Sequence, residues 1–421
     1  MNHNKTRHDR HFDTGCDTGC GTGRRSALVL AFSALLAWAP LSLAGPIEQV
    51  LAMDQASLVV GPARQRLISR HASEPMIPAS TMKLVTALAA IERWGLSHHF
   101  TTEVLVDGNQ RLWIKGSGDP YLVAEELDLL VQALKARGLN RVRGLGLDDG
   151  LYASDLRVPG RSRSNNPYDA PLSALAVNFN TVNLSIGQAG IRSGEPQTPL
   201  TATGRRMGAG LAGGKHRVNL GTRASALSYF GEVLTAKLQQ AGIQVEGDVL
   251  MGSVPASANR LHLHANSRTL EQVLRSMLEY SNNFVANNLF LLLGEQAGQT
   301  SFAQAQRHME DWARRKFGWR DFRIEDGAGL SRGNRLSGEQ MIELLGALAD
   351  YRQLLPEQDN EPRVRAKTGT LSAVSCYAGF VERPQGWVPF SLMINQAAPY
   401  DLRRRLAQAL ADTPTLARPA R

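Results

Sequence analysis

The chain is poor in cysteine, with only three among its 421 residues. Cys16 and Cys20 precede a predicted cleavage site after residue 44, so Cys376 is the single cysteine expected in the mature chain. One cysteine cannot form an internal disulfide. Cys376 lies in an apolar alternating segment, and we expect it to be a small buried core residue rather than a nucleophile.

Patterns typical of metal and nucleic-acid binding are scarce as well. The sequence has no H-E-x-x-H motif and no cysteine pair after residue 44, and the histidine pairs at 98–99 and at 262 and 264 are too few for a metal site. Aromatic residues make up 6% of the chain, which is too few for a large surface on which bases could stack. We therefore expect no metal, no cofactor and no nucleic-acid partner.

Long hydrophobic runs are missing too. The longest near the amino terminus covers residues 27–39, follows Arg24 and Arg25, and ends before Ser42-Leu43-Ala44. This order predicts a secretory signal peptide over residues 1–44, because the run is too short to span a membrane. The alternative is an uncleaved anchor or a buried core helix. Export predicts a periplasmic protein with no membrane span after cleavage. The remaining 42 basic and 35 acidic residues give a net charge of +7, which favours an anionic partner.

The order of predicted elements indicates an α/β (α+β) protein. We expect strands at 57–60, 65–69, 364–371, 375–382 and 388–395, and a hairpin at 102–106 and 111–114. We expect helices from residue 80 to Gly95, at 224–241, 269–280, 284–293 and 402–411, and a glycine-rich loop or linker over 186–216.

These elements predict a chain with one domain inserted into another. Pairing the first two strands with the last three gives a five-stranded antiparallel sheet flanked by helices. Residues 45–95 and 263–421 would then form one domain, and residues 96–262 would form an inserted second domain.

Three short motifs carry the chemistry, in this order: Ser80-Thr81-Met82-Lys83, Ser281-Asn282-Asn283 and Lys367-Thr368-Gly369-Thr370. Each motif alone also fits an ordinary structural role, such as a helix cap or a polar strand end. Their value lies in their joint occurrence, each on a suitable local structure.

The first motif suits nucleophilic catalysis. A serine hydroxyl needs a base at neutral pH, and Lys83 lies three residues along the same helix face as Ser80. The lysine must be at least partly neutral to act as that base. Burial and a nearby second cation, for which Lys367 is the candidate, would both lower its pKa.

The other two motifs suit substrate binding and proton transfer. Ser281 can pass a proton to a leaving amine, and the carboxamide of Asn283 can bond to a substrate peptide group. Gly369 permits close approach of another backbone along a strand edge, where a peptide could bind by β-augmentation. Lys367 and Thr368 could hold a terminal carboxylate, and the N–H groups of Ser80 and Thr370 could form an oxyanion hole.

Taken together, the motifs resemble the S-x-x-K, S-D-N and K-T-G set of penicilloyl serine transferases, with Asn282 in place of the aspartate. The chain is similar to the D-alanyl-D-alanine carboxypeptidase/endopeptidase family, the class C low-molecular-mass penicillin-binding proteins. The further matching segments are Pro78-Ala79-Ser80-Thr81-Met82-Lys83, Gly116-Ser117-Gly118-Asp119-Pro120, Ala170-Pro171-Leu172-Ser173-Ala174-Leu175 and Asp326-Gly327-Ala328-Gly329-Leu330-Ser331-Arg332.

The resemblance implies a transpeptidase-like fold and a serine D,D-peptidase that acts on peptidoglycan stem peptides and is acylated by β-lactam antibiotics. Ser80 would be the nucleophile and Lys83 its base, while Ser281 and Asn283 would line the cleft. Lys367, Thr368, Gly369 and Thr370 would form its strand side. Arg332 matches a position able to meet an anionic part of the substrate.

Two departures from the family pattern affect the expected substrate choice. The stretch over 183–222 is short, so we expect the family's third domain to be absent or reduced to a loop. The segment between Arg332 and Lys367 is also short and lacks the run A-G-x-D-G-T-L-x-x-R. Two other functions stay open: a β-lactamase, which needs a placed base such as Glu325 or Glu339, and a catalytically silent wall-binding scaffold.

Overall fold

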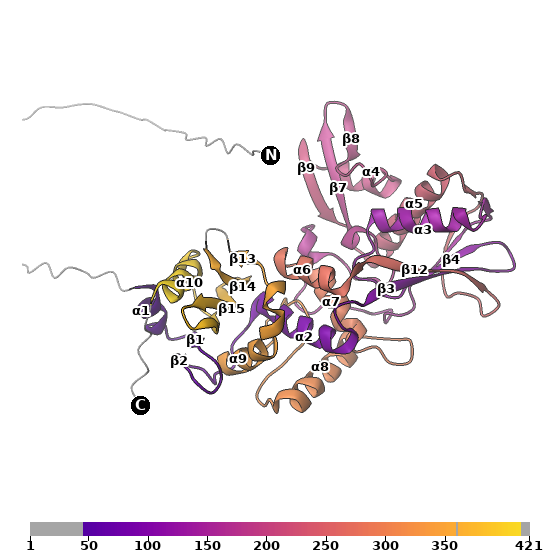
Figure 1. The fold of residues 1–421 in the computed structure, drawn as a ribbon. Coiled ribbons are helices and arrows are strands. Elements are labelled where there is room, and N and C mark those ends of the chain that lie inside the picture. Colours follow the sequence, from indigo (N-terminus) through magenta and orange to yellow (C-terminus); the bar gives the residue numbers. More distant parts are fainter. Residues whose placement is uncertain (1–44, 359–360, 414–421) are drawn as a thin grey trace, which may run out of the picture. The chain divides into compact units, whose positions relative to one another are not determined.

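The computed structural model describes residues 45–358 and 361–413 (Figure 1). The predicted signal peptide lies outside the described residues. Within them, no helix is both long and apolar enough to cross a membrane.

The main sheet has six antiparallel strands in the order β13-β14-β15-β16-β1-β2. They are β1 (Ala56–Val60), β2 (Ile68–Arg70), β13 (Glu357–Gln358), β14 (Glu361–Leu371), β15 (Val374–Arg383) and β16 (Gly386–Ile394). The α/β class and the five predicted strands are confirmed. The count of five is wrong, because β13 adds a sixth strand at the edge that is too short to show an alternating pattern.

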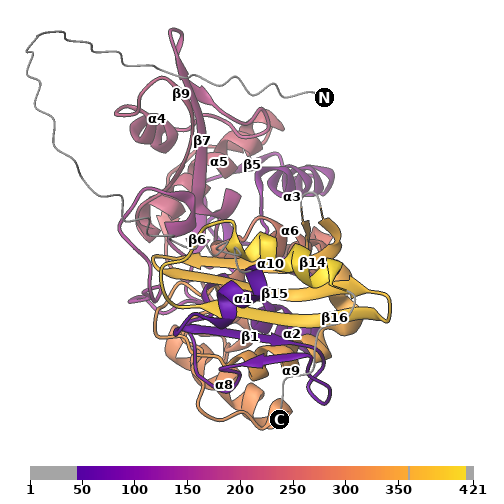
Figure 2. The same cartoon turned by 90° about the vertical axis from the view of Figure 1, so that its left-hand side faces the viewer.

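Helices cover both faces of this sheet (Figure 2). One face packs against α1 (Pro46–Leu51) and α10 (Leu402–Asp412) through an apolar cluster that includes Val364, Phe390 and Leu406. The helices α2 (Met82–Trp94), α6 (Leu270–Glu279), α7 (Asn283–Leu293), α8 (Phe302–Phe317), α9 (Gly338–Ala347) and the 3-10 turn η4 (Ala349–Leu354) belong to a second, larger cluster. Burial of this much apolar surface is the main stabilising contribution to the fold.

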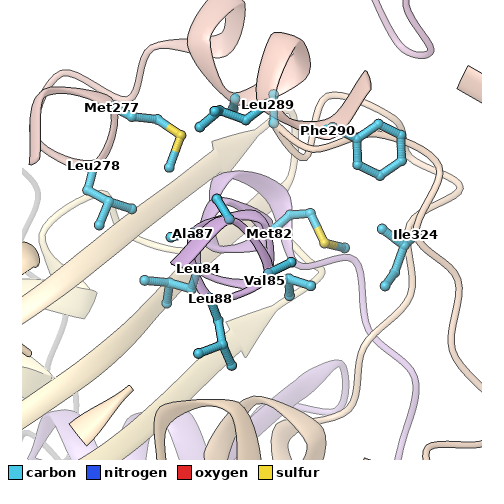
Figure 3. Packing of buried hydrophobic residues seen from close by; sticks show 14 of the residues in the cluster. Met82, Leu84, Val85, Ala87, Leu88, Met277, Leu278, Leu289, Phe290 and Ile324 are labelled. Carbon is cyan, nitrogen blue, oxygen red and sulfur yellow. The ribbon is translucent and has the colours of Figure 1, made fainter. Parts of the chain in front are cut away.

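The helix α2 lies at the centre of the larger cluster. All of its residues from Met82 to Ile91 are buried, which explains why its apolar pattern is nearly continuous. Leu84 and Val85 belong to the same apolar cluster as Met277 and Phe290 of neighbouring helices (Figure 3). A helix packed on all sides holds its first turn, and therefore Ser80, in one position.

The inserted segment has an apolar core of its own, drawn from residues between Val104 and Ile243. Its five-stranded sheet has the order β11-β6-β4-β3-β12. The strands are β3 (His99–Val106), β4 (Leu112–Lys115), β6 (Leu145–Asp148), β11 (Val249–Met251) and β12 (Asn259–Thr269). Helices α3 (Ala124–Ala136) and α5 (Arg223–Gln240) contribute to its core, and β5 (Arg141–Val142) pairs with β10 (Gln244–Val245). β12 crosses the predicted boundary at residue 262, so the division into domains stays a prediction.

The segment predicted as a loop at 186–216 is folded. The strands β7 (Thr181–Gly187), β8 (Gly190–Ser193) and β9 (Gly214–Asn219) form a three-stranded antiparallel sheet beside the short helix α4 (Ala202–Gly208). The loop prediction is therefore wrong. The glycines here interrupt the hydrophobic alternation by which strands are recognised. A Cβ on Gly208 would lie only 3.1 Å from Ile191, so this glycine allows close packing.

Candidate active site

Ser80 lies in a tight turn that leads into α2. One turn of 3-10 helix, η1 (Ala79–Thr81), precedes the α-helix, and the hydroxyl of Thr81 donates to the carbonyl of Pro78 at 2.7 Å. Ala79 has a φ of 47°, which is costly for a residue with a Cβ. Surrounding contacts must hold this turn, and such backbone strain is common at functional sites.

Lys83 is fully buried and points its amine at Ser80. Its Nζ lies 3.0 Å from Ser80 Oγ, 2.7 Å from Asn283 Oδ1 and 2.8 Å from the carbonyl oxygen of Ala328. A carbonyl oxygen can only accept hydrogen bonds, so the oxygens of Asn283 and Ala328 take two N–H groups of the amine. In a neutral amine the third position is the lone pair, which then faces the Ser80 hydroxyl.

The surroundings of Lys83 favour that neutral form. Burial lowers the pKa of Lys83 well below its ordinary value, and the positive charge of Lys367 lowers it further, while Asp326 acts in the opposite direction. The burial and the second cation expected from the sequence are both present, and the role of Lys83 as the base stays a prediction.

The loop after residue 325 fixes the carbonyl group that holds Lys83. The buried carboxylate of Asp326 accepts from the backbone N–H groups of Ala328, Leu330 and Ser331, each at 3.1 Å. The side-chain oxygen of Asn287 accepts from the N–H groups of Gly327 and Ala328. Sequence reasoning recognised this segment as similar to a family motif but gave Asp326 and Ala328 no role.

Gly329 brings the same loop against the nucleophile turn. Its φ is 79°, and a Cβ at this position would lie 1.8 Å from the carbonyl oxygen of Ala79. We expect Gly329→Ala to lower the free energy of unfolding by about 2 kcal/mol or more, and to slow acylation of Ser80. Thermal unfolding and acylation rates would check this. Gly210→Ala, where a Cβ meets nothing within 4 Å, is the matched control and should be neutral; equal behaviour of the two variants would contradict the argument.

The second motif forms the break between α6 and α7. Asn283 turns its amide toward the site: Oδ1 accepts from Lys83, and Nδ2 donates to the carbonyl of Tyr168 at 3.1 Å. Asn282, which replaces the aspartate of the S-D-N pattern, instead caps α7 by accepting from the N–H of Val285. Ser281 has a φ of 52°, and no hydrogen bond joins it to Lys83 within the described residues. Its role as a proton relay stays a prediction.

The third motif lies on β14, directly beside the nucleophile turn. A Cβ on Gly369 would lie 2.9 Å from the backbone nitrogen of Ser80, so the close approach predicted from this glycine is present. The short β13 pairs only with Glu361 and Arg365 of β14, which leaves the edge from Lys367 onward without a paired strand in the described part of the chain. An extended peptide could pair there.

Lys367 is almost fully buried on this strand, and its Nζ donates to the carbonyl of Thr368 at 2.9 Å. Burial, helped by the positive charge of Arg403, lowers the pKa of Lys367 to about 8. Lys367 and Thr368 also line a polar cavity of about 520 Å³, together with Arg275, Glu279 and other residues. A cavity of about 710 Å³ elsewhere, which includes Trp94 at the far end of α2, contains none of the motif residues.

Two arginines complete the surroundings of the strand. Arg332 is exposed, and its Nη1 donates to the carbonyl of Ser372 at 2.9 Å, in the turn that follows β14. Arg403, near the start of α10, donates to Thr370 Oγ1 at 2.7 Å. Sequence reasoning missed Arg403, because nothing in a basic amphipathic helix marks which of its arginines lies against a strand 33 residues earlier.

Comparison with known sequences then decides the family. The chain matches the D-Ala-D-Ala carboxypeptidase 3 (S13) family over residues 48–207, 211–355 and 350–413. It belongs to that family.

Individual relatives agree with this assignment. The chain is 29% identical to a D-alanyl-D-alanine carboxypeptidase from an Actinomadura species, covering 88% of this chain and 82% of the relative. It is 25% identical to the D-alanyl-D-alanine carboxypeptidase DacB of Haemophilus influenzae, covering 82% and 86%. The crystal structure of penicillin binding protein 4 (dacB) from Haemophilus influenzae superposes with a TM-score of 0.70 at 21% identity, over 85% of this chain and 95% of the other. This superposition shows the transpeptidase-like fold with an additional domain.

Burial of Cys376 is confirmed as well. The residue is fully buried, and burial raises the pKa of its thiol to about 12. A thiol of this kind is protonated at neutral pH and unreactive, in agreement with its predicted structural role.

Proposed function

We propose that this S13-family hydrolase is a D,D-carboxypeptidase and D,D-endopeptidase that acts through an acyl-enzyme on Ser80 and needs no cofactor. The observation that carries the proposal is the set of contacts around Lys83 Nζ. Two oxygens that can only accept hold its N–H groups, and the remaining position faces the Ser80 hydroxyl at 3.0 Å. A base held in this way needs no histidine and no metal.

The reaction would proceed in two halves. Ser80 Oγ attacks the carbonyl carbon of the penultimate D-Ala, its proton moves to Lys83 Nζ, and the resulting oxyanion rests on the N–H groups of Ser80 and Thr370. The C–N bond then breaks, and the leaving amine takes up the proton through Ser281. Water then attacks the carbonyl carbon of the ester while Lys83 takes a proton from that water. Lys83 passes the proton to Ser80 Oγ as the ester bond breaks, which restores the hydroxyl.

The strand edge supports binding of a peptide with a free terminal carboxylate. Lys367 and Thr368 would hold that carboxylate, and Asn283 would bond to the peptide on the opposite side of the cleft. The 520 Å³ cavity begins at Lys367 and Thr368 and is bordered by the end of α6, which leads into Ser281. It therefore borders the residues that we propose hold the carboxylate, and it could take a leaving group larger than a single D-Ala.

The contacts of the candidate loop glutamates disfavour a β-lactamase. Glu325 accepts from the hydroxyl of Ser331 at 2.5 Å, and Glu339 is paired with Arg66 at 2.5 Å. Neither forms a hydrogen bond with Ser80 or Lys83 within the described residues. A silent scaffold is disfavoured because such a protein would bear the cost of two adjacent buried lysines without using either.

The proposed setting is the periplasm, with peptidoglycan stem peptides as substrate and β-lactams as acylating inhibitors. The leader-like residues 1–44 and the positive net charge of the mature chain support this setting. Nucleic acid is not among the partners that we propose.

Benzylpenicillin gives the most direct test of this function. We expect the intact mass of the purified mature protein to increase by one penicillin, because the β-lactam ring opens onto Ser80 without loss of atoms. The adduct should map to Ser80 and persist for hours. Fast loss of penicillin without an adduct would indicate a β-lactamase, and neither adduct nor loss would indicate a silent protein.

A further inference from the structure

Arg403 places a positive charge beside the third motif, from an element that carries no motif residue. Its Nη1 donates to Thr370 Oγ1 at 2.7 Å and approaches the carbonyl of Gly369 at 3.5 Å, and its guanidinium lies 5.1 Å from the centre of the Tyr400 ring. The two hydrogen-bond contacts connect α10 to the open edge of β14. Among the described residues, no carboxylate forms an ion pair with Arg403.

The contact with Thr370 has a direct chemical consequence. A guanidinium has no acceptor, so the hydroxyl oxygen of Thr370 must accept from Arg403 and its own proton stays free to be donated. Thr370 is exposed, so its O–H can reach a ligand at the strand edge. The positive charges of Arg403 and Lys367 act at the same edge. The Thr370 hydroxyl, as a donor close to two positive charges, is suited to bind an anionic group of a ligand.

We propose that Arg403 is a specificity-determining positioning residue that, through Thr370, selects ligands carrying a free carboxylate. This inference rests on the proposed function and deepens it. A peptide ending in D-Ala and a penicillin both present such a carboxylate next to the bond that Ser80 attacks. Arg403 would therefore distinguish a free chain end from a blocked one.

The test compares two probes that differ in that charge and in one methyl group: benzylpenicillin and its methyl ester. For Arg403→Ala we expect acylation of Ser80 by benzylpenicillin, followed by intact mass, to slow about 10- to 100-fold, as for loss of one charged hydrogen bond. Acylation by the ester should change less than about twofold, because its carbonyl oxygen can accept a hydrogen bond but carries no negative charge for Arg403 to stabilise. Arg403→Lys keeps the charge and should recover part of the rate with benzylpenicillin.

The matched control is Arg404→Ala, an exposed arginine on the same helix, which should leave both rates unchanged. Equal slowing with both probes would assign Arg403 a structural role only and overturn the inference, as would unchanged rates in both Arg403 variants. If the wild-type protein forms no adduct with either probe, the proposed function itself is wrong. If the wild type reacts and Arg403→Ala reacts at the same rate, only the inference about Arg403 is wrong.

Discussion

Replacing Ser80 by alanine is expected to abolish both D-Ala release and the benzylpenicillin adduct while leaving the fold intact. The substitution removes the attacking oxygen and nothing else of the site. Lys83 keeps its bonds to Asn283 and to the carbonyl of Ala328, and the Cβ at residue 80 is unchanged. The free energy of unfolding should therefore change by about 1 kcal/mol or less, the typical net contribution of one hydrogen bond.

Three measurements check this expectation: release of D-Ala from an acyl-D-Ala-D-Ala peptide, intact mass after incubation with benzylpenicillin, and thermal unfolding. Ser154→Ala, at an exposed serine outside the motifs, is the matched control and should behave as the wild type. Normal D-Ala release by Ser80→Ala would exclude the assignment of the nucleophile. Loss of both activities together with a collapse of the fold would show that Ser80 is needed for structure.

Much of this site is accessible from the sequence because its chemistry depends on short spacings. Ser80 and Lys83 lie three residues apart on one helix, so their proximity follows from helix geometry alone. The central strands of the main sheet are buried on both faces, so they are nearly continuous apolar runs between turn residues and are easily recognised. The third motif is likewise recognisable on its strand, but its approach to Ser80 through Gly369 depends on how the nucleophile turn packs against β14.

The features that sequence reasoning missed depend on contacts between distant segments. Ala328 holds Lys83 through a backbone carbonyl, and any residue type can supply a carbonyl. Arg403 is one of three consecutive arginines, and only the tertiary packing of α10 selects it. The segment over 186–216 was predicted as a loop because it is rich in glycine and has no clear hydrophobic period, whereas several of its glycines allow close packing.

Replacing Lys83 by methionine is expected to slow acylation by about 10²- to 10⁴-fold, the usual contribution of a general base. It should also change the pH profile. In the wild type, protonated Lys83 cannot accept the proton of Ser80, so the rate should rise with pH as the lysine becomes neutral. Because its pKa is lowered, that rise comes well below the pH at which an ordinary lysine loses its proton. Methionine does not titrate, so this rising limb should disappear.

The alkaline side of the profile should survive in the same variant. Lys367 has a pKa of about 8, so its positive charge is lost as the pH rises through that value, and the attraction for a carboxylate weakens with it. Burial and Arg403, not Lys83, lower the pKa of Lys367, so the falling limb should stay at the same pH. A falling limb that vanishes in Lys83→Met would assign it to Lys83 and contradict the anchoring role of Lys367.

Lys237→Met is the control that separates loss of the base from loss of a buried amine. Lys237 is almost as buried as Lys83, but its Nζ lies 2.5 Å from Asp128 and contacts no motif residue. Both substitutions remove a buried lysine amine and replace it with a side chain of similar size, and both are expected to lower the unfolding temperature. Only Lys83→Met should change the rate of acylation and its pH dependence, because only the Lys83 lone pair faces the Ser80 hydroxyl. Similar rates in the two variants would show that a buried lysine supports the fold here without taking part in the chemistry.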